Sequence, residues 1–206
     1  MNIRKTFLAA GMIASLSGCY WQPEVSSTVL IMGDSIMEET SSVFVSTLSR
    51  RDNAPMVINN SMGGMTTVHD GSSEYWSGRV TAIRGQTQVD TVFVSLGAND
   101  MAAYSGEDKT LDVVSIMEEF PTGLDLIMSS MDGVEVYWLV PHIYMSGREE
   151  ALTYVRQALA DAEMRWDNLN LLYIDEMPEY IDEDNIHLNK DGESGVALMF
   201  IDIILQ

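Results

Sequence analysis

The chain is poor in cysteine and in basic residues. It has 206 residues with a single cysteine, so no disulfide can form within one molecule. Lysine and arginine together number 11, against 31 aspartate and glutamate residues, and the formal net charge at pH 7 is −20. Because such a surface repels polyanions and no basic cluster offsets it, the composition argues against nucleic acid as a partner. The acidity itself is typical of a soluble or salt-adapted surface.

The sequence also lacks the patterns that bind metals and phosphates. It contains no His-Glu-x-x-His, no paired Cys-x-x-Cys and no glycine-rich phosphate loop, so it predicts neither a metal ion nor a cofactor. It shows no internal repeat, and no linker rich in proline, glycine or serine after residue 28. One domain over residues 27–206 is therefore predicted, and this length is enough to bury a core of its own.

The apolar segment near the N-terminus is too short to span a membrane. It runs over residues 7–14, follows Arg4 and Lys5, and precedes Leu16-Ser17-Gly18-Cys19. This arrangement resembles a bacterial lipoprotein signal peptide. The resemblance implies a signal peptide over 1–18, palmitate or another lipid on Cys19, a lipidated tether over 19–26, and a membrane-anchored protein of the cell envelope. An ordinary secretory signal with a chance cysteine is the alternative.

The residue after Cys19 indicates which membrane would hold such an anchor. It is Tyr20 and not aspartate. By the resemblance to lipoproteins, this implies the outer membrane of a double-membrane host, with the protein facing the periplasm or the exterior.

Five short apolar runs rich in β-branched residues predict five buried strands. They are 27–32, 56–58, 91–96, 135–140 and 171–174. Helices are predicted between and after them at 36–50, 74–84, 111–131, 148–167 and 190–205, with Pro121 expected to kink or split the third. This alternation predicts a three-layer α/β/α fold with a five-stranded, mostly parallel sheet. The functional crevice is then expected at the carboxyl ends of the strands.

Three short polar blocks follow predicted strands: Gly33-Asp34-Ser35, Gly97-Ala98-Asn99-Asp100 and Asp184-Asn185-Ile186-His187. A serine hydroxyl becomes a nucleophile when a neutral imidazole takes its proton, and an aspartate three residues before the histidine can orient that ring. The asparagine amide can stabilise an oxyanion. Because independent turns have no reason to gather at one sheet edge, the blocks together favour serine-dependent ester hydrolysis.

The blocks closely resemble those of the SGNH hydrolases, also called the GDSL esterase/lipase family, over essentially the whole chain from residue 27 onward. The resemblance implies a flavodoxin-like sheet and a catalytic triad of Ser35, Asp184 and His187. It further implies an oxyanion hole made by the N–H groups of Ser35 and Gly64 and the side-chain amide of Asn99. One departure from the family pattern is a serine, residue 61, where many members carry a further glycine.

Other polar groups have simpler interpretations. The Gly-x-Asn-Asp block could merely cap a helix. His69 and His142 are expected to be surface or loop residues, although His142 follows a predicted strand and could line the crevice. The acidic loop 175–184 leads into His187 and is expected to raise the pKa of that imidazole. A solvated loop with screened charges and a weak calcium site are the alternatives.

Weaker signals bear on the substrate. Aromatic rings near the blocks could stack on sugars, and methionines could line an adaptable apolar pocket. These residues are Tyr75, Trp76, Tyr104 and Tyr144, and Met37, Met62, Met65, Met101 and Met145. Because exported family members often deacylate carbohydrates, the resemblance implies an O-acetyl or acyl esterase acting on cell-envelope or environmental carbohydrate. A lysophospholipase or thioesterase, an acyltransferase, and a non-catalytic glycan-binding lipoprotein are the alternatives.

Overall fold

The computed structural model describes residues 27–103, 113–142, 148–174, 178–184 and 186–205. The predicted signal peptide, the tether and the lipidation site at Cys19 lie outside these residues, as do Tyr104, Tyr144 and Met145. Within the described ranges, no helix combines the length and the apolar character that crossing a membrane requires.

Five parallel strands form one sheet in the order β2-β1-β3-β4-β5. The strands are β1 (Thr28–Gly33), β2 (Met56–Ser61), β3 (Thr91–Ser95), β4 (Glu135–Leu139) and β5 (Leu169–Leu172). The prediction of a five-stranded, mostly parallel sheet is confirmed. After β2 the chain crosses to the other side of β1 to form β3, so a topological switch point lies between β1 and β3.

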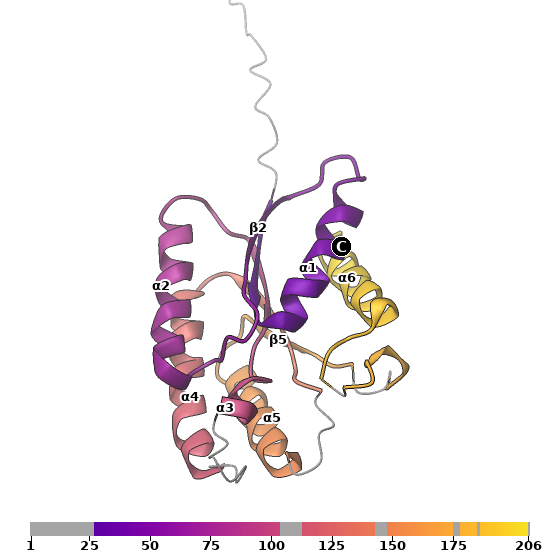
Figure 1. Cartoon of the computed structure of the whole chain (residues 1–206). Helices are drawn as coiled ribbons and strands as arrows, with labels where there is room; N and C mark the ends of the chain where they lie inside the picture. The colour runs from indigo at the N-terminus through magenta and orange to yellow at the C-terminus, as the bar shows by residue number, and fades with distance from the viewer. Residues whose placement is uncertain (1–26, 104–112, 143–147, 175–177, 185, 206) are drawn as a thin grey trace, which may run out of the picture.

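Helices cover both faces of the sheet, as Figure 1 shows. On one face α1 (Ser35–Leu48) packs against α6 (Lys190–Ile204), and on the other lie α2 (Ser72–Arg84), α4 (Val113–Ser130) and α5 (Glu149–Glu163). A short helix, α3 (Asp100–Ala103), follows β3, and two 3-10 turns, η1 (His69–Gly71) and η2 (Pro178–Tyr180), lie in loops. The predicted three-layer α/β/α architecture is confirmed.

Several element boundaries differ from the prediction. β2 continues to Ser61, because its ladder with β1 still pairs Ser61 with Gly33. β5 begins at Leu169, which pairs with Val136 of β4. Pro121 lies inside one helix, α4, so a split at this residue was a wrong prediction. Contacts of α4 with both α2 and α5 stabilise the helix across the hydrogen bond that proline cannot make.

Stacked aromatic rings form the core between the sheet and the α1–α6 layer. Phe93 of β3 stacks on Phe200 of α6 with ring centroids 4.1 Å apart. Phe44 of α1 meets these two rings edge-on at 5.9 and 6.1 Å. All three side chains are fully buried. This packing fixes α1 and α6 against the sheet, and with them the residues at the start of α1 and in the loop before α6.

Candidate active site

The turn between β1 and α1 presents Ser35. Gly33 has a φ of +155°, and a Cβ at this position would collide with the main chain of Ser95. Asp34 then caps the helix, because its Oδ1 accepts a hydrogen bond from the Ile36 N–H at 3.1 Å and its own N–H donates to the Ser95 carbonyl at 2.9 Å. Ser35 is therefore the first residue of α1, half-buried at the positive end of the helix dipole.

A narrow loop before α6 carries Asp184 and His187. Ile181 and Leu188 form an antiparallel bridge at its base, where the Asp182 N–H donates to the His187 carbonyl at 2.8 Å. Leu188 is buried, so the base of the loop is anchored in the core. The local spacing of Asp184 and His187 on this anchored loop is what lets their side chains meet.

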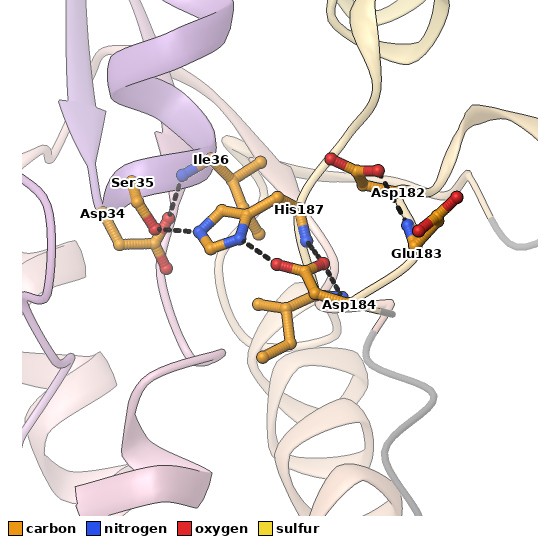
Figure 2. A network of polar contacts seen from close by, with 8 residues as sticks. Asp34, Ser35, Ile36, Asp182, Glu183, Asp184 and His187 are labelled. Carbon is orange, nitrogen blue, oxygen red and sulfur yellow. Dashed lines mark hydrogen bonds and ion pairs between the residues drawn. The ribbon is translucent and has the colours of Figure 1, made fainter.

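The three residues predicted to form the triad lie in one hydrogen-bonded chain, shown in Figure 2. The distance from Ser35 Oγ to His187 Nε2 is 3.0 Å, and the distance from His187 Nδ1 to Asp184 Oδ2 is 2.6 Å. With Nδ1–H donating to the carboxylate, Nε2 is the nitrogen free to accept the serine hydroxyl proton. The arrangement has the geometry of a nucleophile, a base and an orienting acid.

Backbone hydrogen bonds fix the Asp184 carboxylate and keep it ionised. Its Oδ1 accepts from the N–H groups of Ile186 and His187, both at 2.9 Å. Partial burial of the carboxyl group opposes ionisation, but the hydrogen bonds from the His187 ring and from these two N–H groups outweigh it and lower the pKa of Asp184 to about 2. The group that orients His187 therefore carries a full charge over the physiological pH range.

The pKa of His187 lies above its ordinary value. The hydrogen bond with Asp184 is the main cause, partial burial opposes it, and the charges of Asp184, Glu39 and Asp34 raise the pKa further. Glu39 was not singled out from the sequence. Its spacing of four residues from Ser35 puts both on one face of α1, and this spacing is the signal that could have identified it.

The predicted oxyanion donors come from the turns after β1, β2 and β3. Asn99 follows β3 and its side-chain amide donates to the Met65 carbonyl at 3.0 Å. Gly64 lies in the turn just before Met65, exposed and with a φ of +78°. In this turn, a Cβ on Gly63 would stand 3.9 Å from the Ser35 Cβ. The turn after β2 therefore lies beside the predicted nucleophile, as an oxyanion hole requires.

Asp100, the residue after Asn99 at the start of α3, also holds the loop after β2. Its buried carboxylate accepts hydrogen bonds from the N–H groups of Thr67 and Val68, at 2.7 and 3.0 Å, and burial raises its pKa. Asp100 thus joins the end of β3 to the loop after β2. The alternative in which the Gly-x-Asn-Asp block merely caps a helix does not account for these long-range contacts.

Several residues proposed to line the crevice belong to the core instead. Met37, Met101 and Trp76 are fully buried as members of the hydrophobic core. The Trp76 ring N–H donates to the Thr66 carbonyl at 2.9 Å, so it supports the loop after β2 and cannot stack on a sugar. Met65 is partly buried against the core. The exposed candidates within the described residues are Met62 and Tyr75, at 41% and 39% exposure.

The two remaining histidines lie outside the hydrogen-bonded chain described above. His69 belongs to η1 and forms an ion pair with Asp70 at 3.4 Å, in keeping with a surface residue. His142 lies in the loop after β4, as one of the two expected placements, but it is fully buried and so is not a surface residue. This burial depends on packing between distant segments, which no local pattern in the sequence reveals.

Of the acidic loop, Asp184 bonds the imidazole, whereas the side chains of Asp182 and Glu183 do not point at it. Figure 2 shows Asp182 and Glu183 on the side of the loop away from Ser35. Asp182 instead accepts a hydrogen bond from the Glu183 N–H at 2.7 Å. Among the described residues, no group of three or more acidic, histidine or cysteine side chains could hold a metal ion, and residues 175–177 lie outside them.

Comparisons with known proteins address the fold. Neither a protein-family model nor a curated protein sequence matches the chain. A carbohydrate acetylesterase from Sinorhizobium meliloti matches in structure with a TM-score of 0.64 at 14% identity, over 87% of this chain and 98% of that protein. An acetyl xylan esterase matches with a TM-score of 0.62 at 15% identity, over 86% of this chain and 99% of that protein.

A third similar structure carries the family's name. A protein from Parabacteroides merdae, described as a GDSL-like lipase, matches with a TM-score of 0.61 at 13% identity, over 86% of this chain and 94% of that protein. The chain has the SGNH hydrolase fold. The resemblance predicted from the sequence is thus confirmed for the architecture. Within this SGNH fold, Ser35 and Asn99 follow the two strands that flank the switch point.

Proposed function

We propose that the protein is a serine ester hydrolase that works through an acyl-enzyme. The observation that carries the proposal is the hydrogen-bonded chain from Ser35 through His187 to Asp184. Ser35 and His187 are 152 positions apart in the sequence, so their 3.0 Å contact is made by the fold and not by a local turn. An ionised carboxylate, an imidazole and a serine in this order are the parts that acyl transfer needs.

In the acylation half of the reaction, His187 Nε2 takes the proton from the Ser35 hydroxyl while Oγ attacks the ester carbonyl carbon. The charge that develops on the carbonyl oxygen is stabilised by the N–H groups of Ser35 and Gly64 and by the Asn99 amide. Asp184 holds the ring in the required tautomer and stabilises the imidazolium. The C–O bond then breaks, and His187 gives the proton to the departing alcohol.

Deacylation repeats these steps with water. His187 takes a proton from water, the hydroxide oxygen attacks the acyl carbon, and the same donors stabilise the second oxyanion. The bond to Ser35 Oγ breaks and His187 returns the proton to the serine. The products are a carboxylic acid and free enzyme, with no cofactor consumed.

We infer that the substrate is an O-acetyl or other short acyl ester of a carbohydrate. Supporting this are the fold neighbours named as a carbohydrate acetylesterase and an acetyl xylan esterase. Two cavities in the described part of the molecule, of about 400 and 510 Å³, are lined by other residues than the triad and the oxyanion donors. A small acyl group would need no such cavity.

We also propose that a lipid on Cys19 anchors the protein in the cell envelope, at the outer membrane of a double-membrane host. Residue 28 begins β1, whose opposite end leads into Ser35. A tether over 19–26 would therefore enter the domain at the amino end of β1, opposite the end that leads into the proposed active site. That site would then stay clear of the membrane. Cys19→Ser should move the protein from the membrane to the soluble fraction. A wild type found entirely in the soluble fraction would contradict the anchor.

The hydrolase proposal is tested by labelling with a fluorophosphonate and by turnover. Ser35→Ala should abolish both while leaving the thermal midpoint nearly unchanged, because the side chain is half-buried and outside the core. Ser46→Ala is the matched control on the same helix, since its exposed hydroxyl donates to the Val43 carbonyl and faces no reactant. Normal turnover by Ser35→Ala would overturn the assignment of the nucleophile.

A substrate panel then separates the alternatives. Acetylated sugars should be hydrolysed faster than p-nitrophenyl esters of long chains. A preference for long acyl chains or lysophospholipids would favour a lipid esterase, and transfer of the acyl group to an added alcohol would favour an acyltransferase. A wild type that neither turns over nor labels would favour a non-catalytic glycan-binding protein.

A further inference from the structure

A carboxylate on α1 contacts the turn that carries the proposed Gly64 donor. Glu38 Oε2 accepts a hydrogen bond from the Gly63 N–H at 2.9 Å. We infer that Glu38 is a positioning residue of the oxyanion hole, which holds the 62–65 turn so that the Gly64 N–H faces the acyl group on Ser35. This inference rests on the proposed hydrolase function and adds a residue to its machinery.

The Gly64 N–H depends on its neighbours for its direction. Gly64 has a φ of +78°, is exposed, and no atom lies within 4 Å of the position that its Cβ would occupy. Side-chain packing therefore does not hold it. The ends of the turn are tied, because the Met62 N–H donates to the Gly33 carbonyl at 2.8 Å and the Met65 carbonyl accepts from Asn99 at 3.0 Å. Between these two ends, the Met65 N–H donates to the Met62 carbonyl at 3.4 Å, and Glu38 accepts the shorter bond from the Gly63 N–H.

The bond between Gly63 and Glu38 places the 62–65 turn against the start of α1. A Cβ on Gly63 would stand 2.9 Å from Glu38 Oε2 and 3.9 Å from the Ser35 Cβ. Glu38 and Ser35 are three residues apart and lie on the same side of the helix. The helix α1 thus positions both Ser35 and the 62–65 turn. It therefore keeps the proposed Gly64 donor and the nucleophile in a fixed relative position.

A simpler role for an acidic residue near a helix N-terminus is to stabilise the helix itself. Asp34 already caps α1, and the partner in a capping box would be residue 37, one position before Glu38. The Glu38 carboxylate instead reaches an N–H group 25 residues further along the chain. This hydrogen bond therefore acts on the 62–65 turn and not on the end of its own helix.

The charge of Glu38 is not what the turn requires. A carboxylate beside the developing oxyanion opposes the charge that the transition state must accumulate, whereas the Gly63 N–H needs an acceptor oxygen of any charge. Glutamine supplies the same oxygen without the charge. Replacing Glu38 by glutamine should therefore preserve the effect, and replacing it by alanine or methionine should remove it.

The test compares Glu38→Ala, Glu38→Met and Glu38→Gln in the full chain, with p-nitrophenyl acetate as substrate and a fluorophosphonate as the probe of Ser35. Removing an oxyanion donor outright costs about 10²- to 10³-fold in kcat, so a donor that is only loosened should cost about 10-fold. We expect that loss in kcat and in the labelling rate for alanine and methionine, with KM within about 2-fold. Glutamine should stay within about 3-fold of the wild type.

Glu150→Ala is the matched control, an exposed glutamate in the first turn of α5. It should leave all rates unchanged. If the thermal melt shows that Glu38→Ala does not fold, the comparison of Glu38→Met with Glu38→Gln decides the question. Methionine retains the length of the side chain but supplies no acceptor oxygen. Unchanged kcat in the folded variants that lack the acceptor, or a glutamine variant as slow as they are, would overturn the role of Glu38. A wild type inactive in both assays would instead contradict the proposed function.

Discussion

The side-chain amide of Asn99 donates a hydrogen bond to the main-chain carbonyl of Met65 at 3.0 Å. This bond ties the end of β3 to the turn that carries Gly64. An asparagine amide has two N–H groups, so one remains for the oxyanion of a substrate bound at Ser35. Asn99 is therefore placed to brace one proposed donor while acting as another.

Asn99→Ala should consequently lower kcat by about 10²- to 10³-fold with a smaller effect on KM, because a donor aimed at developing charge acts mainly in the transition state. Steady-state kinetics on the preferred acetyl ester measures this. The control is Asn170→Ala on β5, whose amide makes two long contacts of 3.3 Å at the far edge of the sheet. A change confined to KM would make Asn99 a substrate-binding or structural residue.

The activity should rise with pH as His187 loses its proton, and the apparent pKa of this acidic limb should be higher than the ordinary pKa of histidine. The raised pKa of His187 means that the ring stays protonated, and so inactive as a base, to higher pH. Because Glu39 contributes to this shift, Glu39→Gln should lower the apparent pKa of kcat/KM, most visibly at low salt. The measurement is a pH–rate profile at two ionic strengths.

The double variant Asp182→Asn, Glu183→Gln is the comparison for that profile. Both side chains point away from Ser35, so the shift should be smaller than for Glu39→Gln. This revises the sequence-based expectation that the acidic loop as a whole tunes His187. A larger shift from the loop than from Glu39 would restore the original expectation.

Asp34 should make the fold less stable as the pH rises from about 4 to about 7. Burial of its carboxyl group raises the pKa of Asp34 to about 7, with a further increase from the nearby Asp100 and an opposing decrease from the Ile36 N–H. The folded state then binds this proton more tightly than the unfolded state, whose pKa is near 3.8, so stability is lost as the proton leaves.

Asp34→Asn keeps the helix cap without the charge, because asparagine caps as well as aspartate. Its thermal midpoint should match the wild type near pH 4 and exceed it increasingly up to pH 7. Thermal melts across this range measure the difference, with exposed Asp52→Asn as the control. A constant difference between Asp34→Asn and the wild type at every pH would show that Asp34 does not titrate there.

Gly192→Ala should destabilise the protein and slow catalysis. A Cβ on Gly192 would overlap the carbonyl of Tyr180, which accepts the Asn189 N–H at 2.9 Å beside the loop of His187. Forcing this overlap costs about 1–3 kcal/mol of unfolding free energy. Chemical denaturation and kcat together measure it.

Gly78 on α2 provides the matched control. No atom lies within 4 Å of its Cβ position, so Gly78→Ala should stabilise the helix by about 0.5–1 kcal/mol and leave kcat unchanged. If Gly192→Ala and Gly78→Ala behave alike, the close packing of α6 on Tyr180 is not needed.

Local patterns in the sequence determined the strands, the helices and the blocks that end them. Hydrophobic periodicity reports which face of a segment is buried, and it reports this from neighbouring residues alone. It therefore located Ser35 after β1, Asn99 after β3, and the Asp184–His187 pair on one loop. The short spacing of that pair already allowed its 2.6 Å contact.

Contacts between distant segments were decided only by the tertiary structure. The order of the strands, the burial of His142, the reach of Glu39 toward His187 and the bond from Glu38 to Gly63 depend on how α1, the sheet and the loops pack together. No local periodicity encodes such contacts, because they join residues 25 or more positions apart through the packing of whole elements. The sequence by itself therefore determined which chemistry was available, and the packing decided which side chains surround it.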